Sequence, residues 1–341
     1  MIGYYVHHHG LGHLARARQI CAQLASRGHE VVGFSSLTRP DQWPGEWVDL
    51  PLDTLPPGAV AAPLDATAGG VLHWAPLGHE GMGERMSLIA RRLASLDLMV
   101  VDVSVEVALL ARLFGVPTVV VAMRGLRDDR PHAAAYDAAT ALLAPWASEF
   151  PEPWWPTAWM SKTAFVGALS RFDHLDPATA GPADSGGTRP RRVLAVWGGG
   201  GRDLPDDALA SARRATPGWK WLWRSPTEPS PDLWAELLDC DVVVCHGGNN
   251  TVAEVAAARR PAIVLPQSRP FHEQHHTADA LARAGLAVTV EQWPTPERWP
   301  GLLDQAVGIG GSGWGRWNPG DGAARAADAL DRLSRKADHD Q

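Results

Sequence analysis

Two stretches of this chain open in the same way, with a short apolar strand that runs into a glycine-rich turn and then into a helix. The first consists of residues 2–6 and the turn at residues 10–13, and the second of residues 192–197 and the turn at residues 198–201. Strands and helices alternate along both halves, which is typical of parallel sheets covered by helices. The sequence therefore predicts an α/β fold with two Rossmann-like, doubly wound parallel-sheet domains that face a cleft.

The chain length agrees with this prediction, because 341 residues correspond to about two domains of roughly 100–200 residues each. A stretch rich in Pro, Gly, Ser and Asp is typical of a linker and covers residues 174–190. We expect an N-terminal domain over residues 1–173, a C-terminal domain over residues 191–320 and a final helix over residues 321–341. Packing of this final helix back on the N-terminal domain is a hypothesis.

Apolar spacing and glycine stops predict the elements of the N-terminal half. The predicted helices cover residues 14–25, 105–114 and 131–144, and the predicted strands cover residues 2–6, 30–34, 98–103 and 116–122. Residues 38–70 are rich in Pro and Asp and are expected to form a long irregular loop, which in a compact domain tends to be functional.

Composition and charge argue against several classes of protein. The net charge of −7 and the lack of a long basic run disfavour nucleic-acid binding. Charged residues interrupt the apolar residues 98–122, so we expect no membrane span there, while a peripheral membrane contact stays open. A strand beginning beside Met1 gives no signal-peptide pattern. Cys21, Cys240 and Cys245 form neither a disulfide framework nor a zinc spacing, so we expect a cytoplasmic protein. The expected oligomeric state is a monomer or a homodimer.

The most informative motif is HGGNNTVAE at residues 246–254, directly after a buried strand at residues 241–245. Its glycines, Gly247 and Gly248, let backbone amides approach a ligand closely. The helix that follows exposes unpaired N–H groups at its start, which favours an anion such as a diphosphate. Glu254 lies one turn into this helix, where a carboxylate can reach two ribose hydroxyls.

After the next strand, Glu273 and Gln274 offer a carboxylate and an amide to sugar hydroxyls. The pattern His-x-Gly-x-Asn-Thr-x-x-Glu, a proline-led strand and then Glu-Gln resembles the donor signature of GT-B nucleotide-sugar glycosyltransferases, the UDP-glycosyltransferase and MurG-type superfamily. This resemblance covers about the second half of the chain. The resemblance implies that His246, Asn250 and Thr251 hold the diphosphate, Glu254 the ribose, and Glu273 with Gln274 the transferred sugar. Gly247, Gly248 and Asn249 are further candidates for donor binding. A simple helix cap with surface polar residues would explain Thr251 but not the whole array.

The turn Gly-Leu-Gly-His at residues 10–13 resembles the corresponding turn of MurG-type enzymes, whose histidine lies near the acceptor side of the cleft. The resemblance implies that Gly10 and Gly12 direct backbone N–H groups at the phosphates. A neutral His13 is then a suitable general base for an acceptor hydroxyl, and the alternative is a capping or core histidine. Asp102 is expected either to orient His13 or to cap the next helix.

Three other clusters have weaker signals. Gly199, Gly200 and Arg202 are candidates for a phosphate loop, with a flexible turn and a surface arginine as the alternative. The histidines at residues 7–9 are expected to line the cleft or to pack, and only the first and third are expected to converge because strand neighbours point to opposite faces. The charged residues 127–129 are expected to form a solvated loop. No Asp-x-Asp motif appears, so we expect neither a metal nor another cofactor.

These features predict an enzyme of the hexosyltransferase type that moves a sugar from a nucleotide-diphosphate sugar, with UDP or dTDP as the expected nucleotide. The transfer is expected to be inverting and metal-independent, from the C-terminal donor domain to an acceptor hydroxyl or amine in the N-terminal domain. The acceptor is expected to be a small or lipid-linked molecule that contacts residues 73–82. Two alternatives stay open, namely a nucleotide-sugar hydrolase or 2-epimerase and a non-catalytic nucleotide-sugar-binding partner subunit.

Overall fold

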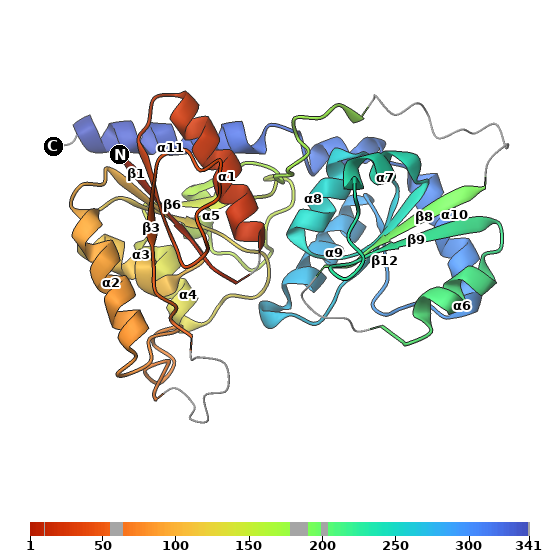
Figure 1. Ribbon diagram of the computed structural model, residues 1–341, viewed down its shortest axis with the longest axis horizontal. Coiled ribbons are helices and arrows are strands. Elements are labelled where there is room, and N and C mark those ends of the chain that lie inside the picture. The colour runs from red at the N-terminus through yellow and green to blue at the C-terminus, as the bar shows by residue number, and fades with distance from the viewer. Residues whose placement is uncertain (10, 55–63, 178–189, 199–203, 340–341) are drawn as a thin grey trace.

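The computed structural model describes residues 1–9, 11–54, 64–177, 190–198 and 204–339, with only the backbone described at residues 11 and 336–339. Two α/β domains lie next to each other, and each has a parallel sheet at its centre (Figure 1). Helices cover both faces of each sheet. The predicted fold class is confirmed.

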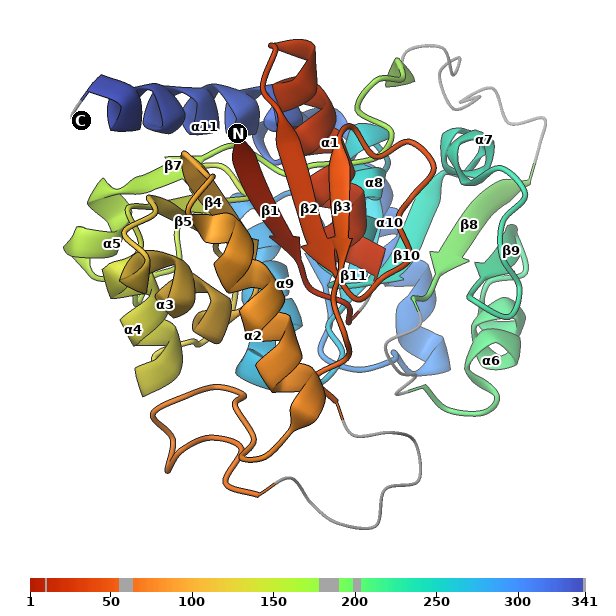
Figure 2. The same cartoon turned by 60° about the vertical axis from the view of Figure 1, so that its left-hand side comes forward.

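The N-terminal sheet has seven parallel strands, most of which are short, fully buried apolar runs, as expected where helices cover both faces. Figure 2 shows β1, β2 and β3 of this sheet side by side. In sheet order the strands are β3 (Glu46–Asp49), β2 (Val31–Ser35), β1 (Ile2–Val6), β4 (Leu98–Asp102), β5 (Thr118–Val121), β6 (Ala141–Ala144) and β7 (Thr163–Phe165). The helices of this domain are α1 (Leu11–Ser26), α2 (Glu80–Leu93), α3 (Val105–Leu113), α4 (Arg130–Ala138) and α5 (Thr157–Ser161).

The C-terminal sheet has five parallel strands and two apolar cores, one on each face. In sheet order the strands are β12 (Val288–Thr289), β11 (Ala262–Leu265), β10 (Val242–His246), β8 (Arg191–Val196) and β9 (Trp219–Arg224). Its helices are α6 (Ala208–Ala215), α7 (Leu233–Asp239), α8 (Asn249–Ala257), α9 (Glu273–Ala284) and α10 (Trp299–Ile309).

The last helix, α11 (Gly322–His339), returns to the N-terminal domain and packs against α1 (Figure 1). Ala326 and Leu330 are fully buried in the apolar core that α1 and β1 also form. At the surface of this contact the ring Nε2 of His29 lies 2.7 Å from Oδ1 of Asp331. The C-terminal end of the chain therefore completes one face of the N-terminal domain.

Each sheet reverses its direction of winding at one point. In the N-terminal sheet the reversal lies between β1 and β4, and in the C-terminal sheet it lies between β8 and β10. Ligands of open α/β sheets bind at the carboxyl ends of the strands beside such a point. Here β4 ends at Asp102 and β10 ends at His246. The topology therefore places residues from both sequence motifs where a ligand is expected.

Two predictions in the N-terminal half were wrong. The predicted helix over residues 131–144 is the shorter helix α4 followed by strand β6, because a four-residue apolar run fits a buried strand as well as a helix. The predicted loop over residues 38–70 contains strand β3 at the sheet edge. The ends of this strand are exposed, so it lacks the continuous apolar run that reveals a central strand.

Candidate functional site

A buried carboxylate organises the N-terminal part of the site. Asp102, at the end of β4, is fully buried, and its Oδ1 lies 2.8 Å from Nδ1 of His13. Arg16, one turn after His13 on α1, donates from Nη2 to the same oxygen at 2.6 Å and from Nε to Oδ2 at 3.0 Å. His13 and Arg16 meet one carboxylate because residues three apart lie on one side of a helix.

Asp102 is a carboxylate that meets both His13 and Arg16. Burial raises the pKa of Asp102, but the positive charge of Arg16 and the hydrogen bonds with His13 and Arg16 outweigh this effect and lower the pKa below its usual range. A carboxylate can only accept, so the 2.8 Å contact requires the proton of a neutral His13 to be on Nδ1. The 3.2 Å approach of Arg16 Nη2 to that nitrogen is then a non-bonded contact. Nε2 of His13 therefore keeps a lone pair that can accept a proton.

The chain turns sharply directly after Asp102. Val103 has a φ of 66°, a left-handed conformation that is strained for a β-branched residue. Ser104 then caps α3, because its side chain accepts a hydrogen bond from the backbone N–H of Val107 at 3.3 Å. The helix cap that was an alternative role for Asp102 is thus supplied by Ser104, which leaves the Asp102 carboxylate to His13 and Arg16.

The C-terminal part of the site begins with His246 at the end of β10. Its Nδ1 accepts a hydrogen bond from the backbone N–H of Gly248, the N-cap of α8, at 2.9 Å. Burial, with a contribution from Arg269, lowers the pKa of His246 to about 4. The ring is therefore neutral at pH 7 with its proton on Nε2, which lies 3.4 Å from the hydroxyl oxygen of Thr251. His246 thus adds an N–H donor beside the unpaired backbone N–H groups of the helix start.

The two helix starts meet across the domain boundary. Gly12 lies so close to Asn250 that a Cβ at position 12 would be 2.7 Å from the side-chain Nδ2. Figures 1 and 2 show α1 and α8 next to each other at this boundary. Each helix start carries a partial positive charge, so their meeting point favours an anion. The structure therefore brings the predicted residues Gly12, His13, His246 and Asn250 into one region.

Glu254 lies on the part of α8 nearest the connection between the domains. Its Oε1 lies 2.8 Å from Nε of Arg171, whose guanidinium stacks over the ring of Phe172 at 4.7 Å. Burial raises the pKa of Glu254, while the charge of Arg171 acts in the opposite direction. The Arg171 side chain is 56% exposed, so solvent weakens this ion pair.

The predicted sugar-binding pair, Glu273 and Gln274, starts α9. The Glu273 carboxylate lies 3.4 Å from the guanidinium of Arg127 in the N-terminal domain. Gln274 is buried, and its side-chain oxygen accepts from the backbone N–H of Gln267 at 2.9 Å, which braces the loop after β11. Of the two side chains, Glu273 is the more accessible to a ligand.

The prediction of a solvated loop at residues 127–129 was wrong for Arg127, which is buried. Its guanidinium stacks over the ring of Phe271 at 4.6 Å. The backbone N–H of Leu126 also donates to the carbonyl of Phe271 at 2.8 Å, so this loop contacts the C-terminal domain. Phe271 and His272 both have positive φ values, 60° and 54°, which mark a strained turn at the boundary.

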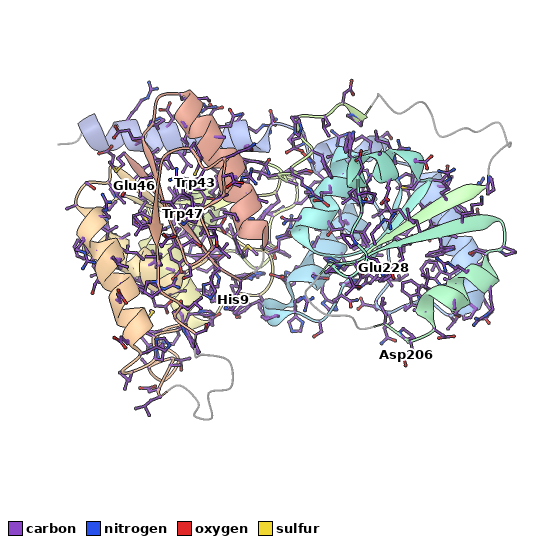
Figure 3. All side chains as sticks on the ribbon, viewed as in Figure 1. His9, Trp43, Glu46, Trp47, Asp206 and Glu228 are labelled. Atoms are coloured by element: carbon purple, nitrogen blue, oxygen red, sulfur yellow. The ribbon has the colours of Figure 1, made fainter. Side chains whose placement is uncertain are left out.

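A cavity of about 250 Å³ lies beside the carboxyl ends of the N-terminal strands. His73, Trp74 and Met82, from the segment predicted to contact the acceptor, form part of its wall. All three histidines at residues 7–9 also line it, with ring centroids 4.2–5.1 Å apart. The prediction that only two would converge was wrong, because β1 already ends at Val6. Figure 3 shows His9 on the side of the N-terminal domain next to the C-terminal domain.

A second boundary contact was not foreseen from the sequence. Arg124 is buried between the rings of Trp146 and Trp317, at 4.8 and 4.9 Å, and donates to Glu152 at 3.0 Å. The other oxygen of Glu152 lies 2.6 Å from Nδ1 of His276 on α9. These residues carry no local motif because their partners are far apart in the sequence.

Some predicted features lie outside the described residues, namely Gly10, Gly199, Gly200 and Arg202. In the parts of the chain that the structure describes, no group of three or more His, Cys, Asp and Glu side chains is arranged to hold a metal ion. Among the same residues, no helix has the length and apolar character to cross a membrane.

Comparison with solved structures identifies the fold class. MurG of Acinetobacter baumannii superposes with a TM-score of 0.66 and 16% identity, covering 97% of this chain and 99% of that one. UGT89C1 of Arabidopsis thaliana, solved with UDP-L-rhamnose, gives a TM-score of 0.65 and 13% identity, covering 98% of both chains. At these identities the likeness establishes the fold alone: the chain has the GT-B fold of glycosyltransferases.

Sequence comparison identifies the family that the C-terminal half resembles. Residues 230–304 match the model of the glycosyltransferase family 28 C-terminal domain, so the predicted resemblance is confirmed. A UDP-N-acetylglucosamine–N-acetylmuramyl-(pentapeptide) pyrophosphoryl-undecaprenol N-acetylglucosamine transferase of Yersinia enterocolitica is 35% identical over 99 residues. That alignment spans 29% of this chain and 27% of the relative's length.

Proposed function

We propose that this chain is an inverting, metal-independent glycosyltransferase of the hexosyltransferase type. It transfers a sugar from a nucleotide-diphosphate sugar, with UDP or dTDP as the nucleotide, to a hydroxyl or amine of an acceptor. The observation that carries this proposal is the approach of the His13–Asp102 pair to the start of α8 across the domain boundary. The GT-B fold and the family 28 match of residues 230–304 support the same function.

The donor would bind with its diphosphate at the start of α8. The backbone N–H groups of the helix start, the Nε2–H of His246 and the side chain of Asn250 are available as donors there. They stabilise the negative charge that develops on the departing nucleoside diphosphate, a role for which a metal is not required. Glu254 would bind the ribose in place of Arg171, and Glu273 would bind hydroxyls of the sugar.

The acceptor would react from the N-terminal side of the boundary. Its oxygen forms a bond to the anomeric carbon while the bond from that carbon to the phosphate oxygen breaks. His13 Nε2 takes the acceptor proton, and the buried carboxylate of Asp102 stabilises the imidazolium that results. A single in-line displacement of this kind inverts the configuration of the anomeric carbon.

The cavity beside His73 and Trp74 favours transfer over hydrolysis or 2-epimerisation, because neither alternative needs room for a second organic substrate. Cys21, Cys240 and Cys245 are buried and form no disulfide, which fits action in the reducing cytoplasm. The partners are thus the nucleotide sugar and a small or lipid-linked acceptor.

A thermal-shift panel of UDP-, dTDP- and GDP-sugars tests the donor assignment. A ligand at 100 times its Kd stabilises a protein by about 2.7 kcal/mol, which gives a measurable rise in Tm. We expect one nucleotide class to raise Tm with or without EDTA, and the product from an accepted alcohol to have the inverted anomeric configuration by NMR. If no nucleotide sugar raises Tm, the proposed function is wrong.

A further inference from the structure

The N-terminal cavity combines an apolar wall with a small cluster of polar residues, called here the polar group. The apolar wall consists of Met86, Val103, Val121, Met123, Ala135 and Tyr136. The polar group comprises His8, Asp53, Arg85 and Tyr5, which also line the cavity. A few positioned polar groups in an apolar cavity are typical of sites that orient a small ligand.

His8 has no hydrogen-bond partner inside the protein, although its side chain is only 8% exposed and lines the cavity. Its Nε2 lies 3.5 Å from Oδ1 of Asp53, which is longer than an N–H···O hydrogen bond. Nε of Arg85 is likewise buried without a hydrogen-bond partner. Buried polar atoms are nearly always paired, so these unpaired atoms indicate a missing ligand group.

The other two guanidinium nitrogens of Arg85 and the Tyr5 hydroxyl have partners. Arg85 donates from Nη1 to the hydroxyl of Tyr5 at 2.7 Å and from Nη2 to Ser36 and to the carbonyl of Pro51. Burial raises the pKa of Tyr5 to about 12, so its hydroxyl stays protonated. These hydrogen bonds hold Arg85 and Tyr5 in place. The ring nitrogens of His8, beside the Asp53 carboxylate, still lack a hydrogen-bond partner.

We propose that His8 and Asp53 bind a second, non-reacting hydroxyl group of the acceptor, which makes the acceptor a compact, mainly apolar molecule with at least two hydroxyl groups. This inference rests on the proposed transferase function. The ring of His7 lies near those of both His8 and His13, with centroids 5.0 Å and 5.8 Å away. A molecule of one or two fused rings can therefore reach His8 and His13 at the same time.

A hydroxyl group fits this place better than other polar groups. Burial lowers the pKa of His8 despite the opposing charge of Asp53, so the ring is neutral and supplies one N–H donor. One ligand hydroxyl beside the pair can accept from that N–H and donate to the Asp53 carboxylate, so it bridges two groups that lie 3.5 Å apart. A ligand carboxylate would be repelled by Asp53, and a ligand ammonium would lie beside the buried guanidinium of Arg85.

Equilibrium binding to the full chain tests the inference. The probes are regioisomeric dihydroxynaphthalenes and the matching naphthols, with Kd values measured by calorimetry. For at least one isomer we expect the diol to bind about tenfold more tightly than the naphthol. His8→Phe and the more conservative Asp53→Asn should each reduce this ratio to below about twofold.

The pair His29 and Asp331 provides a matched control. These residues also form a histidine–aspartate contact, but at the packing surface of α1 and α11, remote from the cavity lining. His29→Phe should leave the diol preference intact, and thermal denaturation should show that all variants are folded.

Three results would overturn the inference: equal affinity of wild type for diol and naphthol, a preference retained in both His8→Phe and Asp53→Asn, or no binding of either probe class. These measurements need no turnover and no nucleotide. The donor panel tests the proposed function separately, because nucleotide sugars would bind to the C-terminal domain.

Discussion

Gly12 on α1 and Asn250 on α8 are in direct contact across the boundary between the two domains, with no room for a side chain at position 12. This contact brings His13, the proposed general base, close to the start of α8, the proposed diphosphate site. The atom next to Gly12 is the flexible end of the Asn250 side chain, which can rotate away. A substitution at Gly12 is therefore expected to change catalysis more than folding.

Gly12→Ala should lower kcat/KM on the order of tenfold, because the new methyl group would displace Asn250 from the diphosphate site, where small errors in position are costly. The free energy of unfolding should change little. In an Asn250→Ala background the same Gly12→Ala change should have almost no further effect on kcat/KM, since the side chain it displaces is gone. Full additivity in this double-mutant cycle would contradict the explanation.

His13→Ala and Asp102→Asn should separate catalysis from folding. His13→Ala should reduce kcat on the order of 10²-fold or more, with little loss of stability, because it removes a general base at a partly exposed position. Asp102→Asn should reduce kcat similarly and also destabilise the fold by about 3–5 kcal/mol, because it leaves Arg16 buried without its counter-charge. Urea denaturation and steady-state kinetics on the same preparations check both parts. Equal stability of the two variants would show that the Asp102–Arg16 pair does not support the fold.

His246→Ala should lower kcat about 10²–10³-fold, as expected when one N–H donor to a developing negative charge is lost. The KM for the acceptor should be unchanged, because His246 belongs to the C-terminal domain and does not line the N-terminal cavity. Steady-state kinetics with each substrate varied in turn measures both values. Unchanged turnover would remove His246 from the diphosphate site.

Glu254→Ala should weaken nucleotide binding about tenfold or more, since hydrogen bonds to a charged group contribute about 1.5–3 kcal/mol. The wild-type protein should bind UDP more tightly than 2′-deoxy-UDP, and Glu254→Ala should abolish this difference. Arg171→Gln should strengthen UDP binding, because Arg171 competes for the same carboxylate. Calorimetric titrations of the three proteins provide the test, and a preference for UDP that survives in Glu254→Ala would place the ribose elsewhere.

Stability should fall as the pH decreases from about 6.5 towards 4. Burial lowers the pKa of His7 to about 3 and that of His246 to about 4, whereas an unfolded histidine has a pKa of about 6.5. In this range the unfolded chain binds protons that the native protein does not, so each histidine contributes up to about 1.4 kcal/mol per pH unit. His7→Gln and His246→Gln should each flatten the dependence in denaturant titrations at pH 7.5, 6 and 5. A slope identical to that of the wild type would contradict these pKa values.

Much of the fold was predictable because its strands are continuous apolar runs and because glycines end some of its helices. The predicted strands over residues 2–6 and 98–103 agree with β1 and β4 to within one residue. Gly28 and Gly115 follow α1 and α3 with positive φ values of 88° and 75°, as expected for residues that end helices. Strand β6 was missed because its four apolar residues carry no period that distinguishes a strand from a helix.

The candidate site was most predictable where one local segment supplies it. The motif at residues 246–254 lies on one strand, turn and helix, so its spacing in the sequence already fixes its arrangement. The roles of Arg16, Arg124 and Arg127 depend on partners 86, 28 and 146 residues away, and no local pattern predicts such pairs. The contact of His13 with Asp102 was expected because both residues lie at the carboxyl ends of predicted strands, and the structure shows that these two strands are neighbours in one sheet.

The return of α11 to the N-terminal domain has a consequence for biosynthesis. A domain usually folds as soon as its own residues have left the ribosome. Here Ala326 and Leu330, which follow the first strand by about 320 residues, fill the same core as that strand. The first half of the chain must therefore wait with one apolar face uncovered until α11 has been made, and a fragment truncated before residue 322 would expose that face permanently.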